Sequence, residues 1–417
     1  MAKYIVQGGR KLNGTVKVSG SKNAALPILC ATLLTNQKST IKNVPDIADI
    51  RNMIGLLEFV GCKVTFEKGV ITVDPKALKS KPVVMDGVCN MRASVLLLGP
   101  LLARFNKAKI SFPGGCILGK RPVDVHLTGL EGLGGKVHDD KEMISMTANS
   151  LKGADITMKE ISVTATENIV MAAVLAKGKS HVRLAAAEPH VQDLCRMLNK
   201  MGAKIKGIGT HDLTIEGVSK LQGANHTVIG DYLEAGTFAV AAAITNGNVK
   251  ITGINPHDLD IVWNKFEEAG IDLKFTSNSV EVLPHGRLKR VSKIRTAVFP
   301  SFPTDLQAPF TVLLTMTPGE SMVHETLFDG RLNYLAELEK MGAKFEILNP
   351  HQAIIHGPHK LEAAPISSWD IRAGAAMVLA ALAAKGKTEI SNIGFIDRGY
   401  ENLEGKLKKL GAKIERV

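Results

Sequence analysis

The chain has 417 residues, which is long enough for two or more domains of ~150 residues each. Apolar residues make up 45% and charged residues 22%, a globular composition that excludes a disordered or fibrous chain. The 52 Lys and Arg side chains outnumber the 40 Asp and Glu side chains, and the resulting net charge of +12 favours an anionic partner such as nucleic acid, anionic lipid or a phosphorylated small molecule.

The cysteines and the chain's first residues indicate a compartment. Five cysteines, an odd number with no C-x-x-C pair, argue against a disulfide framework or a zinc site and favour a reducing cytosol. Residues 1–9 lack the apolar core of a signal peptide, and the longest apolar run, 375–384, is shorter than the ~18 residues of a membrane span. We therefore expect a cytoplasmic protein.

In chain order, the predicted elements repeat six times. Each repeat reads strand, buried helix, strand, amphipathic helix, strand, strand, and the apolar helices begin near residues 23, 92, 166, 236, 307 and 372. A glycine ends each amphipathic helix before the next strand, where it can take the left-handed conformation. These glycines are Gly61, Gly134, Gly202, Gly270, Gly342 and Gly411.

The repeats predict two domains of three. The strands of residues 4–20 resemble the pair that is missing after residue 417, so we expect them to complete the last repeat and to bring the chain ends together. Lys22 and Asp231 occupy equivalent positions, and we place the two domain crossings there. The predicted domains are 22–230, and 1–21 plus 231–417.

A glycine- and proline-rich segment, 112–122, interrupts the second repeat. It carries Cys116, and the nearby Lys120 and Arg121 would stabilise the thiolate and lower the thiol pKa. The alternative is a surface loop with an unreactive thiol.

Several charged residues stand at the starts of buried helices. Lys22 and Asn23 open the first one, where a helix N-terminus can bind an anion. Arg92 and Arg372 open two others, and a cation there opposes the helix dipole. Either an anionic ligand or a carboxylate would remove this penalty, and Asp370 is close enough in sequence to pair with Arg372.

Asp305 lies just before the fifth buried helix. It could cap that helix, or it could act as a general base beside cations. Arg331 and Arg398 are further cations on turns, where each alone is usually a solvated charge.

Five motifs together strongly resemble the UDP-N-acetylglucosamine enolpyruvyl transferases of the EPSP synthase superfamily. They lie at residues 19–29, 91–94, 113–126, 302–307 and 397–400. The resemblance covers essentially the whole chain, and the cysteine loop is its most specific part, because EPSP synthases share the sixfold architecture without that loop.

The resemblance implies an α/β fold, a two-domain inside-out α/β barrel of six βαβαββ repeats, three per domain, with the active site in the cleft between the domains. It implies transfer of enolpyruvyl from phosphoenolpyruvate to the 3′-hydroxyl of UDP-N-acetylglucosamine, with release of phosphate. This reaction proceeds by addition and elimination through a tetrahedral intermediate, without a metal or cofactor, and is the first committed step of peptidoglycan synthesis. A monomer that binds no nucleic acid is expected.

The resemblance also implies roles for individual residues. Cys116 matches a proton donor and the target of fosfomycin, and Asp305 matches a candidate base. The residues matching phosphoenolpyruvate ligands are Lys22, Asn23, Arg121, Arg331, Arg372 and Arg398, with Asp370 in support. The residues matching nucleotide-sugar ligands are Asn23, Arg92, Arg121, Pro122, Val123, Asp124, Val125, Ser162, Val163, Asp305 and Leu327.

Three positions depart from the family pattern. Ala48 and Glu160 each stand where a Lys is found in other members, and Thr164 stands where a Gly is found. A different class also remains open, a basic repeat protein that binds RNA ends. Phosphate release with both substrates, or a salt-resistant nucleic-acid complex, would distinguish the two.

Overall fold

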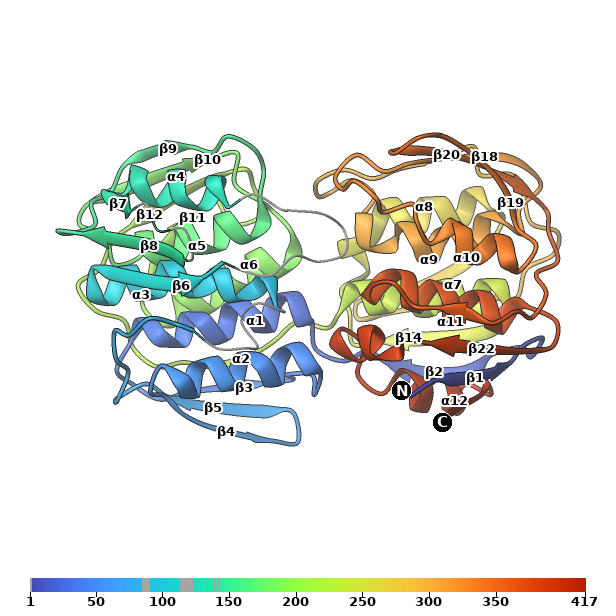
Figure 1. The fold of residues 1–417 in the computed structure, drawn as a ribbon, viewed down its shortest axis with the longest axis horizontal. Coiled ribbons are helices and arrows are strands. Elements are labelled where there is room, and N and C mark those ends of the chain that lie inside the picture. The colour runs from blue at the N-terminus through green and yellow to red at the C-terminus, as the bar shows by residue number, and fades with distance from the viewer. Residues whose placement is uncertain (1, 85–90, 113–122, 139, 141–142) are drawn as a thin grey trace. The chain divides into compact units, whose positions relative to one another are not determined.

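The computed structural model describes residues 2–84, 91–112, 123–138, 140 and 143–417. The described chain divides into two compact units (Figure 1). Unit 1 comprises residues 2–19 and Gly230–Val417, and unit 2 comprises the described part of residues 20–229. The domain boundaries predicted from the sequence, 22–230 and 1–21 plus 231–417, remain a prediction.

Unit 2 contains the first three repeats. Its α-helices are α1 (Lys22–Ala31), α2 (Ala48–Phe59), α3 (Leu98–Phe105), α4 (Asp124–Gly132), α5 (Val163–Ala173) and α6 (Pro189–Lys200), and the 3-10 helices η1 (Thr32–Leu34) and η3 (Arg92–Leu97) adjoin α1 and α3. Its strands are β3 (Ser39–Lys42), β4 (Lys63–Glu67), β5 (Val70–Asp74), β6 (Lys107–Ser111), β7 (Gly135–His138), β8 (Met143–Ala148), β9 (Asp155–Thr157), β10 (Lys179–Arg183), β11 (Lys204–Lys206), β12 (Asp212–Glu216) and β13 (Asn225–Thr227).

Unit 1 contains the other three repeats. Its helices are α7 (Tyr232–Ile244), η4 (Pro256–Leu259), α8 (Asp260–Glu268), η5 (Thr304–Leu306), α9 (Gln307–Leu314), α10 (Leu335–Lys340), α11 (Ile371–Ala383), η6 (Ile393–Arg398) and α12 (Leu403–Lys409). Its strands are β1 (Tyr4–Gln7), β2 (Asn13–Lys17), β14 (Asn248–Thr252), β15 (Leu273–Thr276), β16 (Ser279–Val282), β17 (Lys293–Arg295), β18 (Gly319–His324), β19 (Lys344–Asn349), β20 (Gln352–Gly357), β21 (Ile366–Ser367), β22 (Lys387–Ser391) and β23 (Lys413–Arg416).

Each of the six repeats forms its own sheet, and all six sheets share one topology. In β9-β10-β12-β11, for example, the edge strand β9 runs parallel to β10, and the remaining neighbours are antiparallel. The sheet β6-β8-β7 completes the pattern through a parallel bridge between Val83 and Ile110. The edge strand precedes the buried helix and its parallel partner follows that helix, so the predicted βαβαββ order is confirmed.

Two edge strands are exchanged where the chain passes between the units. β2 precedes α1 but pairs with β14, and β13 precedes α7 but pairs with β3. The prediction that residues 4–20 complete the last repeat is therefore only half right. β1 does so, between β22 and β23, and Lys3 bonds with Val417. β2 instead joins the fourth sheet, because the helix that follows β2 in the chain belongs to unit 2.

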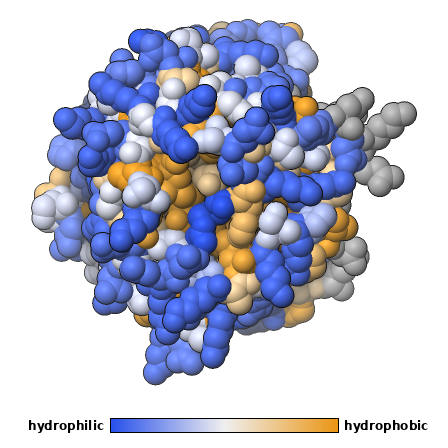
Figure 2. All heavy atoms as spheres, turned by 90° about the vertical axis from the view of Figure 1, so that its left-hand side faces the viewer, coloured by the Kyte–Doolittle hydropathy of each residue, from blue (hydrophilic) through white to orange (hydrophobic). Residues whose placement is uncertain are grey.

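The apolar helices form the centre of each unit, and the sheets lie outside them (Figure 1). All 13 residues of α7 are buried, and α7, α9 and α11 pack on one another. In unit 2, α5 packs against α3 and η3, and α1 packs against η3. Most side chains on the face drawn in Figure 2 are hydrophilic, which fits a fold whose apolar helices are internal. Within the described residues, no helix is both long and apolar enough to cross a bilayer.

The six repeat glycines all adopt positive φ. Their φ values are +108°, +94°, +100°, +78°, +90° and +100° for Gly61, Gly134, Gly202, Gly270, Gly342 and Gly411. This backbone conformation is costly for residues with a Cβ atom, so the predicted role of these glycines at the helix ends is confirmed.

The cost of this conformation can be measured without a steric contribution. A Cβ added at Gly342 would meet nothing within 4 Å, as would one at Gly286, which lacks a positive φ. We expect Gly342→Ala to lower the free energy of unfolding by about 1–2 kcal/mol and Gly286→Ala to leave it nearly unchanged, as measured by urea denaturation. Equal effects of the two substitutions would contradict the assigned role of the repeat glycine.

Candidate active site

Asp305 forms the centre of a charged cluster in unit 1. It lies in η5, directly before α9, and its carboxylate accepts from Arg331 Nη2 at 2.7 Å and from Arg372 Nε at 3.1 Å. Neither η5 nor α9 receives a side-chain cap. The capping alternative is therefore wrong, and the carboxylate is held between two guanidinium groups.

Arg372 is fixed from several directions. It is the second residue of α11 and is only 3% exposed. Asp370 does not neutralise the guanidinium, as the sequence suggested, because its Oδ1 atom accepts instead from the backbone N–H groups of Arg372 and Ala373 and caps the helix. The guanidinium carbon lies 5.2 Å from the centre of the Tyr400 ring. Burial lowers the pKa of Arg372, but Tyr400 and Asp305 raise this pKa more, so the guanidinium keeps its charge.

Arg331 is also buried beside carboxylates. Burial lowers its pKa, but Asp305, Asp370 and Glu325 together raise this pKa above its ordinary value. The Asp305 cluster, defined here as Asp305, Arg331, Arg372 and the capping Asp370, therefore holds two permanent positive charges inside unit 1.

Glu325 supports the Asp305 cluster, and this role was not predicted from the sequence. Its carboxylate is fully buried and accepts from Thr304 Oγ1 at 2.8 Å, Thr296 Oγ1 at 3.0 Å and Leu327 N at 2.9 Å. It thus ties the turn that carries Asp305 to the segment that carries Leu327, whose side chain is 39% exposed. The available signal in the sequence was an acidic residue directly after the segment that forms β18.

Arg398 is placed by a close contact between η6 and α11. It ends η6, and a Cβ atom on the following Gly399 would lie 2.5 Å from Ile371 Cγ2. The absence of a side chain at Gly399 therefore lets the Arg398 turn approach the start of α11. Two residues later, the buried Tyr400 hydroxyl lies 2.9 Å from Thr237 Oγ1 on α7, which fixes the ring that stacks on Arg372.

The unit 2 residues gather at helix starts. Lys22 and Asn23 are the first residues of α1, and the Ser21 hydroxyl caps the helix by accepting from Ala24 N. The Lys22 ammonium lies 3.3 Å from Asp49 Oδ2, and its side chain is only 11% exposed. Lys22 is therefore an oriented charge rather than the solvated one that its position alone would also allow.

Arg92, Val123–Val125, Ser162 and Val163 stand at the starts of η3, α4 and α5. Arg92 begins η3, Asp124 begins α4, and Ser162 precedes α5 without a side-chain capping bond. His126 on α4 lies among them and is almost completely buried. Burial, followed by the charge of Arg92, lowers the pKa of His126 to about 3.

The predicted Cys116, Arg121 and Pro122 lie outside the described residues. Cys89 also lies outside the described residues, and the other three cysteines, Cys30, Cys62 and Cys195, are buried free thiols. Burial raises all three thiol pKa values, to about 12 for Cys62 and Cys195. These thiols are therefore poor nucleophiles at neutral pH.

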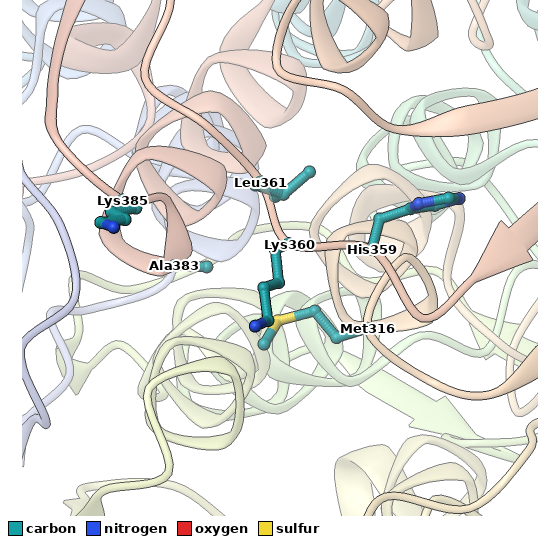
Figure 3. Close-up of a pocket in the computed structure, with 6 residues that line it drawn as sticks. All are labelled: Met316, His359, Lys360, Leu361, Ala383 and Lys385. Atoms are coloured by element: carbon teal, nitrogen blue, oxygen red, sulfur yellow. The ribbon is translucent and has the colours of Figure 1, made fainter.

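A surface pocket lies elsewhere in unit 1 and has no part in the Asp305 cluster. Figure 3 shows its lining, and none of the residues singled out from the sequence contributes to it. The lining residues are Met316, His359, Lys360, Leu361, Ala383 and Lys385. In the described parts of both units, no group of three or more His, Cys, Asp or Glu side chains is arranged to hold a metal ion.

His126 makes acid stability testable. Its folded-state pKa is about 3, below the ordinary 6.5, so the unfolded chain binds the extra proton between these values. The stability from the neutral imidazole is present above pH 6.5 and is lost as the pH falls toward 3, at up to ~1.4 kcal/mol per pH unit. We expect His126→Gln to flatten urea-unfolding stability between pH 4 and 6.5. Replacing the exposed His257 by Gln should preserve the slope, and an unchanged slope in His126→Gln would contradict the assignment.

The described architecture matches known enolpyruvyl transferases. Residues 6–407 match the family model of EPSP synthase (3-phosphoshikimate 1-carboxyvinyltransferase). The enolpyruvyl transferase NikO from Streptomyces tendae superposes with a TM-score of 0.90 at 23% identity, covering 100% of this chain and 99% of that one. EPSP synthase from Acinetobacter baumannii gives a TM-score of 0.78 at 20% identity, covering 100% of both chains. These structures support the inside-out α/β fold.

Relatives found by sequence define the family more narrowly than the structural neighbours do. A protein of Saccharophagus degradans named UDP-N-acetylglucosamine 1-carboxyvinyltransferase is 46% identical over 100% of both chains. A protein of Coxiella burnetii with the same name is 44% identical over 100% of this chain and 96% of its own length. Identity at this level along the whole chain shows that the protein belongs to the UDP-N-acetylglucosamine 1-carboxyvinyltransferase family, within the EPSP synthase superfamily.

Proposed function

We propose that the protein catalyses the reaction of its family, the transfer of enolpyruvyl from phosphoenolpyruvate to the 3′-hydroxyl of UDP-N-acetylglucosamine in peptidoglycan synthesis. The observation that carries this proposal is the Asp305 carboxylate held between two buried arginines, in a chain 46% identical to a named transferase over its full length. Both substrates are polyanions, which suits a site with buried arginines. No observation favours the alternative of a protein that binds RNA ends.

The chemistry divides into addition and elimination. In the addition, Cys116 gives a proton to the methylene carbon of phosphoenolpyruvate, the sugar hydroxyl oxygen bonds to C2, and Asp305 takes the hydroxyl proton. The product is a tetrahedral intermediate that carries both the sugar and the phosphate. In the elimination, a methyl proton returns to the Cys116 thiolate, the C2–O bond to phosphate breaks with its electron pair on the phosphate oxygen, and the proton held by Asp305 passes to the departing phosphate. The double bond is restored in the product, and both side chains regain their starting states. No electrons are gained or lost overall.

The Asp305 cluster suits both substrates. Arg372 and Arg331 keep the carboxylate ionised and oriented, which is what a general base requires before the hydroxyl arrives. Arg372 Nη1 is buried, and its hydrogen-bonding capacity is unfilled within the described chain. An oxygen of phosphoenolpyruvate would satisfy this atom. Arg331 and Arg398 add positive charge from the same unit, and Lys22, Asn23 and Arg121 are the corresponding assignments in unit 2.

The nucleotide sugar is assigned mostly to residues at helix starts. In unit 2 these are Asn23, Arg92, Val123, Asp124, Val125, Ser162 and Val163. Arg121 and Pro122, which the family resemblance adds, lie outside the described residues. In unit 1 the assigned residues are Asp305, which lies in η5, and Leu327. Cations and uncapped backbone N–H groups at helix N-termini are suited to a diphosphate.

The same proposal includes a monomer in the cytoplasm. Both substrates are charged metabolites that do not cross a bilayer unaided. The reaction must therefore take place in the compartment where they are made.

Asp305→Asn tests the general base. We expect turnover to fall ~10²–10⁴-fold, because the amide cannot accept the hydroxyl proton. Phosphate release is measured with both substrates, at a temperature where circular dichroism shows the native fold. Asp260→Asn, which alters an exposed carboxylate on α8 of the same unit, should leave turnover unchanged. Nearly full activity in folded Asp305→Asn would remove Asp305 from the mechanism.

Cys116 is testable by mass spectrometry. We expect fosfomycin to add once per chain at Cys116, because a thiol beside Lys120 and Arg121 titrates below ~8.5, whereas burial raises the pKa values of the described thiols. Cys116→Asp should retain some turnover without labelling, and Cys116→Ser should be nearly inactive. An adduct on Cys30, Cys62 or Cys195, or a fully active Cys116→Ser, would contradict this role.

A further inference from the structure

We infer that Thr164 is a substrate-contacting residue whose hydroxyl donates a hydrogen bond to the diphosphate of the nucleotide sugar. We further infer that His126 is the positioning residue that orients this hydroxyl. The inference rests on the proposed nucleotide-sugar site at the starts of η3, α4 and α5. It concerns two side chains that no family assignment given above includes.

A buried chain of hydrogen bonds fixes the direction of each donor. Gly99 N–H donates to Asn168 Oδ1 at 2.8 Å, so the Asn168 amide nitrogen must point the other way. Its two N–H groups then serve Val95 O at 2.9 Å and His126 Nδ1 at 2.8 Å. Val95 lies in η3, Gly99 in α3, His126 in α4 and Asn168 in α5, so these hydrogen bonds link four successive helical segments of unit 2.

The donor and acceptor directions in this series of hydrogen bonds determine the tautomer of His126. Because Nδ1 accepts from Asn168, the neutral imidazole carries its proton on Nε2. Nε2 lies 3.1 Å from Thr164 Oγ1 and therefore donates to it. Burial and Arg92 keep the imidazole neutral, so this assignment holds throughout the physiological pH range.

The Thr164 hydroxyl keeps one O–H donor, and its contact with His126 fixes the direction in which that O–H points. A hydroxyl has one proton to donate, and the imidazole N–H occupies one of its lone pairs. His126 is the only hydrogen-bond partner of the Thr164 side chain within the described residues, and the side chain is half-buried rather than solvated. The proton is therefore directed away from His126 and is available to an acceptor.

The surroundings select an anionic acceptor. Thr164 is the second residue of α5, a helix of 11 residues whose first N–H groups receive no side-chain cap from Ser162. The charge of Arg92 acts on His126 and therefore lies close to the same point. A phosphate oxygen is the acceptor that both features favour. Of the two substrates' phosphate groups, the diphosphate matches, because Ser162 and Val163 are assigned to the nucleotide sugar.

Thr164→Val removes the hydroxyl and keeps the shape. We expect the KM and the calorimetric Kd for UDP-N-acetylglucosamine to rise roughly 10- to 100-fold, the range of a hydrogen bond to a charged group. The kcat and the KM for phosphoenolpyruvate should stay unchanged, and Thr164→Ser should restore binding. The matched control is Thr214→Val, whose hydroxyl lies 3.2 Å from His181 Nδ1 in the same unit and outside the site. It should bind both substrates normally.

His126→Phe tests the positioning role. It should raise the KM for UDP-N-acetylglucosamine, as Thr164→Val does, and the double variant should bind the nucleotide sugar no worse than Thr164→Val alone, because both changes act on the same contact with that substrate. If His126→Phe does not fold, Thr164→Val and Thr164→Ser decide the inference by themselves.

Arg92→Ala separates this inference from the proposed site. A raised KM for the nucleotide sugar in Arg92→Ala, with normal binding in Thr164→Val, would overturn the inference and leave the site assignment standing. Normal binding in both variants would overturn both. A rise confined to the KM for phosphoenolpyruvate in Thr164→Val would also overturn the inference, because the acceptor would then belong to the other substrate.

Discussion

The structure depends on the burial of apolar helices against one another. α7 exposes no residue, and neither a single repeat nor a single sheet could cover it. α9 and α11 provide the missing cover, so three repeats form the smallest group that completes a core. The sheets then lie outside, where their outer faces can carry charged side chains. Three repeats per unit is thus a requirement of burial as much as a feature of the sequence.

Burial also explains why the assigned residues lie at helix N-termini. The first turn of a helix has N–H groups without intrahelical partners, and a buried helix must satisfy them with side chains or ligands. Asp231 and Asp370 do so for α7 and α11 as caps. Arg372 at the start of α11 opposes the helix dipole, and Asp305 compensates its charge together with that of Arg331, which lies on a turn before α10. The charged clusters are thus concentrated where the apolar architecture leaves polar groups unfilled.

Much of the fold could be predicted from the sequence, because its signals are local. Gly342 marks a backbone conformation, and the apolar run at 371–383 marks a buried helix, whatever lies around them. The position of β2 could not be predicted in this way, because its partner β14 follows a different helix and lies far along the chain. The capping role of Asp370 was equally hidden, since pairing with Arg372 and capping its helix require the same sequence spacing. Glu325 and His126 act through residues distant in sequence, so only the folded chain reveals their partners.

The exchange of edge strands has a consequence for the history of the chain. Ser19 O accepts from Asp231 N, and Ser21 N donates to Ile229 O, both at 2.8 Å. The stretch from 20 to 229 therefore enters and leaves unit 1 through neighbouring points and forms one uninterrupted segment of the gene. Joining Ser19 to Gly230 would leave the remainder as a second continuous segment of three repeats. This arrangement is what the insertion of one ancestral three-repeat gene into a duplicate of itself would produce, with the insertion point between an edge strand and the helix that follows it.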